Sequence, residues 1–497
     1  MDAALTSQLP LAETFDQAYL EYWGILPLEV TEGHVRVAAS GDVATEVLDD
    51  LAASYNAAVD LVPVPRDELL DAVRRTFSAA ESVVELVKDL EAEMGGTGTG
   101  DEGGGADARD LANQPPVIRL VNLLVREAHD VQASDIHLEA TREGLRARFR
   151  IDGVLQDVPN PPRGLQAAVI SRIKLLAELD IAERRLPQDG RIRVRLDQRE
   201  LDLRVSTVPT LYGESVVLRL LDRGGRPVAL DELGMAPDAL AAFRKLAERP
   251  HGILLATGPT GSGKTTTLYA ALGLRQRNAE KIITVEDPVE YHLNQVTQVP
   301  VHTKAGMTFA SALRSILRQD PDVLMVGEMR DAETASIGMQ AAMTGHLVFS
   351  TLHTNDAVSA LVRLTDLGVE PYLVAATVEG VLAQRLVRRI CPDCRERYKP
   401  DAQAVALLAQ QPVGAKTLER GRGCARCRDT GYRGRTGLFE LLVVTDQFKQ
   451  AFAAQQPLDK LHDIARAQGM RTLREDGWAK VAAGITTVEE VLRVTDH

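Results

Sequence analysis

The sequence predicts an α/β protein of several domains, and three features of the chain support this prediction. Its length of 497 residues exceeds the roughly 100 to 200 residues of one ordinary domain. A glycine-rich run at residues 95–105 interrupts the chain and has the composition of a flexible linker. After residue 228, helical stretches alternate with short apolar strands, which is the order of a mainly parallel sheet covered by helices.

Residues 1–94 form the first predicted domain, and they carry the acidity of the chain. They contain 19 acidic and 5 basic side chains, a net charge of −14, while the whole chain has a net charge of −13. Residues 67–94 place apolar side chains at helical spacing, with acids on the other face. The acidity indicates either a solvated face or an electrostatic docking surface. A flexible linker, residues 95–108, is expected to follow.

A second domain with antiparallel strands is predicted for residues 109–225. Residues 146–151 alternate polar and apolar and run into Asp152 and Gly153, a strong signal for a tight hairpin. Residues 191–196 and 201–205 alternate in the same way and predict a second strand pair. This domain is therefore expected to be α+β.

The third predicted domain, residues 226–497, contains the parallel sheet. Its expected strands are residues 253–256, 282–285, 323–326 and 347–350. The first of these runs into a motif that matches Gly-x4-Gly-Lys-Ser/Thr at residues 258–265, and an apparent helix follows it. In this setting glycines let backbone N–H groups surround phosphate oxygens, and the helix N-terminus adds its positive end.

The motif predicts a nucleotide site that binds ATP with Mg²⁺. Lys264 is expected to reach the β and γ phosphates, and the Thr265 hydroxyl to ligate Mg²⁺. The nucleotide-binding residues that we assign are Gly258, Pro259, Thr260, Gly261, Ser262, Gly263, Lys264, Thr265 and Thr266.

Two carboxylates follow expected strands of the same sheet and are candidates for catalysis. Glu286 ends one strand and Glu328 comes two residues after another. A carboxylate at such a place acts through water on Mg²⁺ or orients the attacking water. Because Glu328 stands where Asp is more usual, a water-mediated role is favoured over direct metal ligation. Two histidines, His346 and His353, flank a later strand. His353 is the candidate for sensing the γ-phosphate, and a purely structural role is the alternative for both histidines.

All four cysteines of the chain occur in two Cys-x2-Cys pairs. These are Cys391, Cys394, Cys424 and Cys427, and 29 residues separate the pairs. Two such pairs predict a tetrahedral zinc site with four thiolate ligands and a structural role. A redox pair or free thiols are the alternatives. The expected zinc module covers about residues 385–437.

Much of the chain after the linker closely resembles the type II secretion ATPases of the secretion ATPase superfamily. Residues 258–265 look like the Walker A motif of that family, residues 284–291 like its Asp box, 326–331 like its atypical Walker B and 345–354 like its His box. Residues 134–139, 186–192 and 204–207 are similar to its second N-terminal domain. The resemblance implies a RecA-like P-loop NTPase domain for residues 226–497.

The resemblance also implies a function and partners. The protein would be a homohexameric, Mg²⁺-dependent ATPase that drives assembly of a pseudopilus and export of folded proteins. Its first domain would dock to an inner-membrane platform protein, so the chain would be cytoplasmic and associate with the membrane only through partners. Arg204 and Arg219 would approach the phosphates from the second domain, and Arg314, Arg318 and Arg435 would complete a site shared between subunits.

Three other functions remain as alternatives. A type IV pilus extension ATPase is the nearest. A nucleic-acid translocase is disfavoured, because the region after the linker is nearly neutral and aromatic residues make up only 4% of the chain, which leaves few rings to stack on bases. A scaffold that binds ATP without turnover is the third. The 45% hydrophobic composition and the lack of a long apolar run or a signal-like N-terminus fit a cytosolic globular protein.

Overall fold

A computed structural model of the chain shows α/β architecture, as predicted. It describes residues 17–31, 33–55, 57–78, 112–196, 199–222, 228–275, 279–400 and 417–495, with a few single positions between 15 and 90. The chain divides into two compact units, residues 1–127 with 159–169, and residues 128–158 with 170–497. Within the described ranges, no helix combines the length and the apolar character needed to cross a membrane.

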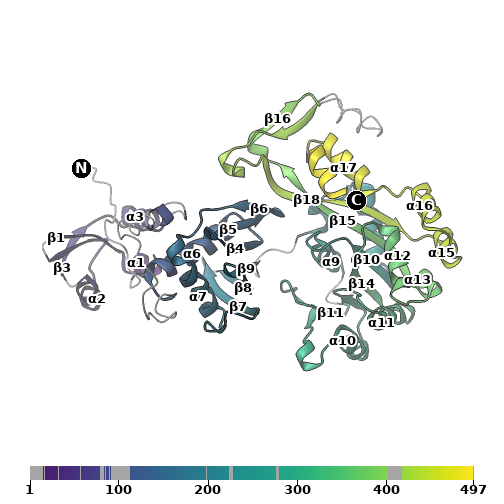
Figure 1. Ribbon diagram of the computed structural model, residues 1–497, viewed down its shortest axis with the longest axis horizontal. Coiled ribbons are helices and arrows are strands. Elements are labelled where there is room, and N and C mark those ends of the chain that lie inside the picture. Colours follow the sequence, from purple (N-terminus) through teal and green to yellow (C-terminus); the bar gives the residue numbers. More distant parts are fainter. Residues whose placement is uncertain are drawn as a thin grey trace. The chain divides into compact units, whose positions relative to one another are not determined.

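The first unit contains a three-stranded sheet with helices packed on it (Figure 1). Its elements are α1 (Gln17–Trp23), β1 (Ile25–Thr31), β2 (His34–Ala39), α2 (Thr45–Tyr55), β3 (Ala58–Pro63) and α3 (Arg66–Ser78). Val35 and Val37 of β2, Leu51 of α2, and Leu69 and Val73 of α3 are fully buried in one core. The helix predicted for residues 67–94 is thus present in its first part as α3. Most of its remainder and the linker at 95–108 lie outside the described residues.

A six-stranded antiparallel sheet in the second unit confirms both predicted hairpins. Its order is β6-β5-β4-β9-β8-β7. The strands are β4 (Asp135–Thr141), β5 (Gly144–Ile151), β6 (Val154–Asp157), β7 (Gln188–Leu196), β8 (Arg199–Thr210) and β9 (Gly213–Asp222), and the helices α6 (Pro115–Asp130) and α7 (Gln166–Leu176) interleave with them in sequence. Asp152 and Gly153 form the β5–β6 turn with φ angles of +50° and +84°, the positive values that a tight hairpin turn requires.

The second sheet of this unit has seven strands in the order β12-β11-β13-β14-β10-β15-β18. Its strands are β10 (Gly252–Thr257), β11 (Ile282–Glu286), β12 (Thr297–Pro300), β13 (Val323–Val326), β14 (Leu347–Leu352), β15 (Val378–Ile390) and β18 (Tyr432–Val443). All neighbours pair in parallel except β15 and β18. The four strands expected from the sequence are therefore present and parallel.

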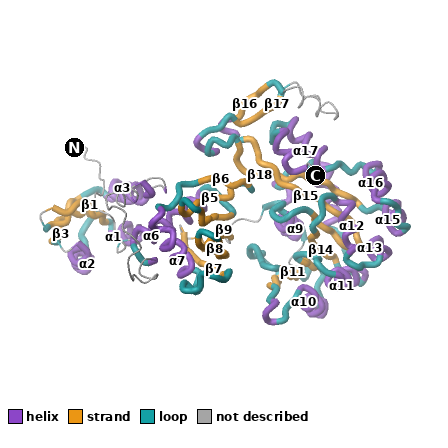
Figure 2. The backbone as a smooth tube through the Cα atoms, in the orientation of Figure 1, coloured by secondary structure: helices purple, strands orange, loops and turns teal. Residues whose placement is uncertain are grey.

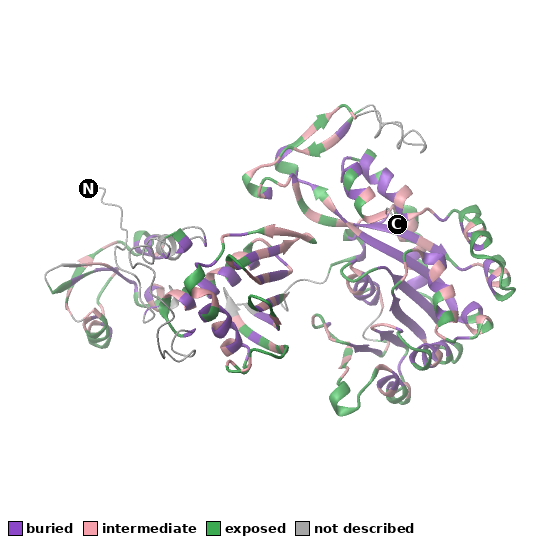
Figure 3. Cartoon of the chain, in the orientation of Figure 1, coloured by how far each residue is buried: buried purple, intermediate pink, exposed green. Residues whose placement is uncertain are grey.

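Helices cover both faces of the seven-stranded sheet, so its central strands are buried (Figures 2 and 3). Along β10 the side chains alternate. Ile253 and Leu255 enter one apolar core, and Leu254 and Ala256 enter the other, as the period of two of a strand requires. The helices are α8 (Pro237–Ala247), α9 (Lys264–Leu272), α10 (Phe309–Ile316), α11 (Ala332–Met343), α12 (Ala357–Asp366), α13 (Pro371–Thr377), α15 (Asp446–Ala453), α16 (Leu458–Ala467), α17 (Leu473–Ala482) and α18 (Val488–Thr495).

The long strands β15 and β18 continue beyond the rest of the sheet into the region of the cysteines. A two-stranded sheet, β16 (Arg395–Tyr398) with β17 (Leu418–Gly421), lies between them in sequence. The carboxylate of Glu490 in α18 binds the Arg388 side chain of β15 at 2.7 Å. The C-terminal helix is thereby fastened to the same strand that continues toward the cysteines.

Candidate nucleotide-binding site

The phosphate loop, residues 258–263, joins the end of β10 to the start of α9. Gly258, Gly261 and Gly263 have φ angles of +143°, +78° and +88°, a region that other residues rarely adopt. A Cβ atom at Gly258 would also lie 2.4 Å from the carbonyl oxygen of Gln384, so the neighbouring strand β15 leaves no room for a side chain. The loop has the strand-to-helix setting that the motif predicts, with the positive end of α9 beside it.

Lys264 begins α9 and is buried, with 8% of its surface exposed. Its Nζ donates hydrogen bonds to the carbonyl oxygens of Gly258 at 2.8 Å and Pro259 at 2.9 Å. Burial lowers the pKa of Lys264 to about 8, against the attraction of Glu328 and together with the positive charge of Arg385. The amine therefore lacks an adequate counter-charge, which the phosphates of a nucleotide would supply.

A second polar group of the loop is also without a partner. The hydroxyl of Ser262 is buried and has no hydrogen bond within the described residues, a costly arrangement unless a ligand satisfies it. Thr265 and Thr266 are half-buried at the start of α9. These donors fit a polyphosphate with its Mg²⁺, and the assignment of residues 258–266 to nucleotide binding stays a prediction.

Glu328 lies two residues after the end of β13, and β13 is separated from β10, the strand that enters the phosphate loop, by β14 alone. Its carboxylate forms an ion pair with Arg330, and its other oxygen lies 3.5 Å from Nε2 of His353. Glu328 is half-buried and close enough to Lys264 to oppose the fall in that pKa. Of the two predicted catalytic carboxylates, Glu328 is therefore the one that is partly exposed and close to Lys264 at the end of the phosphate loop.

Glu286, the other predicted carboxylate, is enclosed at the end of β11. It is 2% exposed, and its oxygens accept hydrogen bonds from Tyr269, Thr284 and, at 3.2 Å, Gln298. Burial and the charge of Glu286 raise the pKa of Tyr269. This network ties β11 to α9 and β12, so its contacts favour a structural role. A catalytic role for Glu286 stays a prediction.

The two histidines of the segment around β14 have different surroundings. Nδ1 of His346 lies 2.9 Å from the carbonyl oxygen of Ala341, which is a local structural contact. His353 is exposed and faces Glu328. The next residue, Thr354, bonds Thr257 at the end of β10, since their hydroxyl oxygens lie 2.7 Å apart. The loop that carries His353 is thus joined to the strand that enters the phosphate loop.

The predicted arginines Arg204 and Arg219 line a hollow with Asp287, the residue after β11. Arg219 also forms an ion pair with Asp135 at 2.9 Å. Burial lowers the pKa of Arg204, although the negative charge of Glu290 opposes this. Within the described residues, neither side chain forms a hydrogen bond or an ion pair with the phosphate loop. Their approach to phosphates stays a prediction.

The three remaining arginines are partnered within the chain. Arg314 pairs with Glu333, Arg318 donates to the carbonyl oxygen of Arg314 at 3.0 Å, and Arg435 lies 3.5 Å from Asp152. All three are partly exposed. Their role in a site shared between subunits stays a prediction as well.

Gln384 and Arg385 of β15 belong to the surroundings of the site, and no sequence motif includes them. Oε1 of Gln384 accepts the Thr267 hydroxyl at 2.7 Å, and Arg385 donates to Asn355 at 2.9 Å. Both are buried. The available signal was a polar pair between two apolar runs of the strand, residues 381–383 and 386–387, because a buried polar side chain requires partners.

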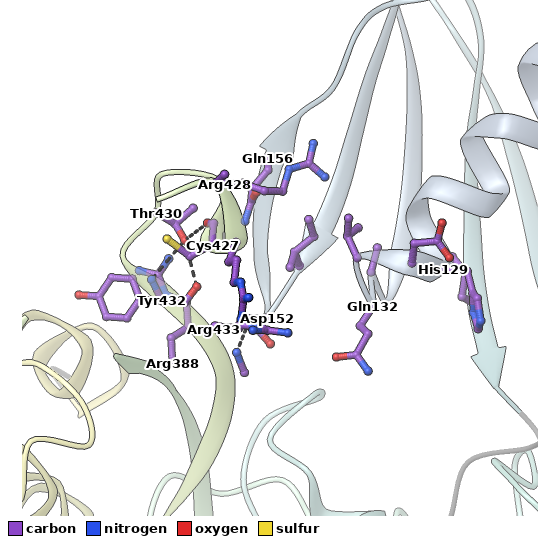
Figure 4. Close-up of a pocket in the computed structure, with 18 of the residues that line it drawn as sticks. His129, Gln132, Asp152, Gln156, Arg388, Cys427, Arg428, Thr430, Tyr432 and Arg433 are labelled. Atoms are coloured by element: carbon purple, nitrogen blue, oxygen red, sulfur yellow. Dashed lines mark hydrogen bonds between the residues drawn. The ribbon is translucent and has the colours of Figure 1, made fainter. Parts of the chain in front are cut away.

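The four cysteines, predicted to bind one metal ion, lie together. Cys391 precedes and Cys394 ends one 3-10 turn (Pro392–Cys394), and Cys424 precedes and Cys427 ends another (Ala425–Cys427). Their sulfurs all lie within 4.8 Å of one another. Thr430 closes the second loop by donating to the carbonyl oxygen of Cys427 at 2.6 Å (Figure 4).

The sulfur positions fit a tetrahedral metal ion. Three of the Sγ–Sγ distances are 3.9 Å, 3.8 Å and 3.6 Å, for Cys391–Cys424, Cys394–Cys427 and Cys424–Cys427. A tetrahedron with ~2.3 Å Zn–S bonds requires about 3.8 Å. Although burial opposes it, backbone N–H groups of Gly431 and Cys424 help to lower the pKa of Cys427 to about 7. These four residues therefore form a candidate metal site.

The chain is similar to known secretion proteins over almost its whole length. A family model described as "Type II/IV secretion system protein" matches residues 110–493. The chain is 46% identical to "Type II secretion system protein E" of Xanthomonas campestris pv. campestris, over 98% of this chain and 86% of that protein. It is 49% identical to "Type II secretion system ATPase E" of Vibrio cholerae, over 78% of this chain and 77% of that protein.

Solved structures share the fold. One of the pilus retraction motor PilT with bound ADP has a TM-score of 0.52 and 27% identity, and it covers 75% of this chain and 96% of the PilT chain. The ATPase DotB of Legionella pneumophila has a TM-score of 0.56 at 19% identity, over 76% of this chain and 95% of that chain. The DotB likeness is one of fold alone.

Proposed function

Because the chain belongs to the type II/IV secretion system protein family, we propose that it is an ATPase that drives pseudopilus assembly and protein export by type II secretion. The family predicted from the sequence motifs is thereby confirmed. Relatives that match this chain over most of both lengths carry the type II secretion name. The observation that carries the enzymatic part is a complete phosphate loop with the Glu328–His353 pair at the end of a nearby strand of the same sheet.

The residues of this site have distinct roles in the proposed reaction. The loop N–H groups and Lys264 bind the phosphates, and Thr265 would hold Mg²⁺, which neutralises charge on the phosphoryl oxygens. Glu328 orients the attacking water, and His353 fixes the position of the Glu328 carboxylate. Little covalent chemistry is required of the protein, so the rate depends on positioning and on electrostatic stabilisation.

ATP hydrolysis by purified full-length protein tests this proposal. Lys264→Ala is expected to lose nucleotide binding and turnover, while Glu328→Gln is expected to lose turnover but still bind a fluorescent ATP analogue with Mg²⁺. Unchanged turnover of Glu328→Gln would support a scaffold that binds ATP without using it. Hydrolysis stimulated severalfold by DNA would support a nucleic-acid translocase instead.

The assembly and its partners form a second part of the proposal. We infer a cytoplasmic homohexamer that associates with the inner membrane through partners, and residues 1–94 as the segment that docks to a platform protein. The acidity of these residues supports an electrostatic component. A pull-down with full-length protein, compared with a variant lacking residues 1–94, tests the docking. The four-cysteine cluster would hold one structural Zn²⁺.

A pilus extension ATPase remains the second candidate, because a solved pilus motor shares the fold at 27% identity. Deletion of the gene separates the two functions. Loss of exoprotein secretion with normal surface pili supports type II secretion, and loss of pili with normal secretion supports pilus extension.

A further inference from the structure

Arg385 is a buried cation that lacks an acidic partner. It is 6% exposed, and in the part of the chain that the structure describes no carboxylate forms an ion pair with it, so burial alone acts on its guanidinium and lowers its pKa. Its Nε atom has no hydrogen-bond partner there. An unpaired guanidinium in such a setting is costly, so its retention requires an explanation that the fold alone does not provide.

The segment that carries Arg385 touches the phosphate loop. Its neighbour Gln384 binds Thr267 of α9, and the carbonyl oxygen and Nε2 of Gln384 lie within 3 Å of where Cβ atoms of Gly258 and Gly263 would be. Arg385 is close enough that its charge contributes to the lowered pKa of Lys264. Two cations therefore lie near one loop, and each raises the free-energy cost of burying the other as a charged group.

Arg385 also reaches the loop that carries His353. Its Nη2 donates to Oδ1 of Asn355 at 2.9 Å, and Asn355 follows Thr354, which bonds Thr257. Asp356 then caps α12 by accepting from the Ser359 N–H at 2.8 Å. A single loop thus connects Arg385, the His353–Glu328 pair and the start of a helix.

We propose that Arg385 is a positioning residue of the nucleotide site: the phosphates of a bound nucleoside triphosphate supply its missing counter-charge, and its bond to Asn355 holds the His353 loop in place. The inference rests on the proposed ATPase function. It assigns Arg385 an electrostatic effect on phosphate binding and a steric effect, through Asn355, on the groups that act on the attacking water. With nucleotide bound, the cost of burying two cations is offset.

Variants of Arg385 separate this role from a merely structural one. In Arg385→Gln, the unfolding temperature of the nucleotide-free protein stays the same or rises, because an uncompensated buried charge is removed. Its affinity for a fluorescent ATP analogue falls about tenfold, the range of one charge-assisted interaction, and nucleotide raises its unfolding temperature less. Arg385→Lys restores most of the affinity but keeps a low kcat, because lysine does not reproduce the planar contact with Asn355. Arg389→Gln, on the exposed part of the same strand, is the matched control and behaves as wild type.

A second variant tests the proposal without removing the arginine. Asn355→Asp places a carboxylate opposite Arg385, so the nucleotide-free protein unfolds at a higher temperature while nucleotide affinity falls severalfold. A structural role for Arg385 predicts the higher unfolding temperature with unchanged affinity.

Two results would overturn the inference. One is an Arg385→Gln protein that unfolds several degrees lower without nucleotide yet binds the analogue as wild type does. The other is unchanged affinity in Asn355→Asp. A wild-type protein that neither binds nor hydrolyses ATP would instead refute the proposed function itself, so the two failures are distinguishable.

Discussion

Replacing Lys264 with methionine tests whether burial penalises the charged amine of the phosphate loop when no nucleotide is bound. Methionine keeps an unbranched side chain of similar length and removes the charge. Burial lowers the pKa of Lys264 from 10.5 to about 8. Between these values the unfolded chain holds a proton that the native protein has released, so the stability of the wild type rises with pH through this window.

The size of the effect follows from that shift. A displacement of roughly 2.5 pKa units corresponds to about 3 kcal/mol of penalty on the charged native state at neutral pH. Most of the penalty, about 2 kcal/mol, disappears between roughly pH 7.5 and pH 10. The methionine variant has no such gain. It also loses the hydrogen bonds to Gly258 and Pro259, at a cost of about 1–3 kcal/mol that does not depend on pH.

Urea unfolding measured at several pH values checks the prediction. The chain has two tryptophans, so a Trp23→Phe background leaves Trp478 as the only indole. Trp478 belongs to α17, is 2% exposed and packs in one core with side chains of α18. Lys245→Met, at an exposed position of α8, is the control. Subtracting the free energy of unfolding of the variant from that of the wild type at each pH cancels the contributions of all other titrating groups.

The free energy of unfolding of the wild type, relative to that of Lys264→Met, is expected to rise by about 2 kcal/mol as the pH rises from about 7.5 to 10. Saturating Mg²⁺ and ATP should flatten this slope, because phosphates restore the charged amine. A difference that stays constant with pH in the nucleotide-free protein would refute the argument that burial depresses this pKa.

Three further predictions concern other parts of the chain. Cys394→Ser is expected to reduce bound zinc and lower the unfolding temperature, and elemental analysis that finds no zinc in the wild type would contradict the metal site. Glu440→Ala should destabilise the protein by about 2–4 kcal/mol in urea unfolding, because the carboxylate accepts the N–H groups of Ala357 and Leu473 at the starts of two helices; Glu440→Gln should lose less. Binding of residues 1–94 to the platform partner should weaken as salt rises, since charges at an exposed surface are screened, and salt-independent binding would indicate a solvated acidic face.

The fold was largely predictable because its strongest signals are local. Asp152 and Gly153 indicate the β5–β6 turn through the positive φ angles that they tolerate. The buried parallel strands appear as short apolar runs between helical stretches, and Ile253 to Ala256 is one of them. The number of strands was harder to predict. The short β12 and the antiparallel β18 carry weaker patterns, and β18 is placed by pairing with β15.

The candidate site residues also fall into those that a local motif identifies and those that only their surroundings distinguish. The phosphate loop and the cysteine pairs could be identified because each concentrates its ligands within a few residues. The sequence placed Glu286 and Glu328 on equal terms as acids that follow strands. Their environments separate them, since Glu286 is enclosed by Tyr269, Thr284 and Gln298, whereas Glu328 faces His353. No local pattern contains the donors that surround a buried carboxylate.

The sequence by itself determined the Gly-rich loop between a strand and a helix, the two cysteine pairs, the alternation of strands and helices and the family, because these depend on residue types at short, fixed spacings. Only the tertiary structure decided which polar side chains lack a partner. Within the described residues, the Ser262 hydroxyl and Nε of Arg385 have no hydrogen-bond partner, and burial lowers the pKa of the nearby Lys264 amine. The physical reason is that burial and pairing depend on neighbours from distant parts of the chain, here β15 and the loop after β14, and desolvation acts only once those neighbours have excluded water.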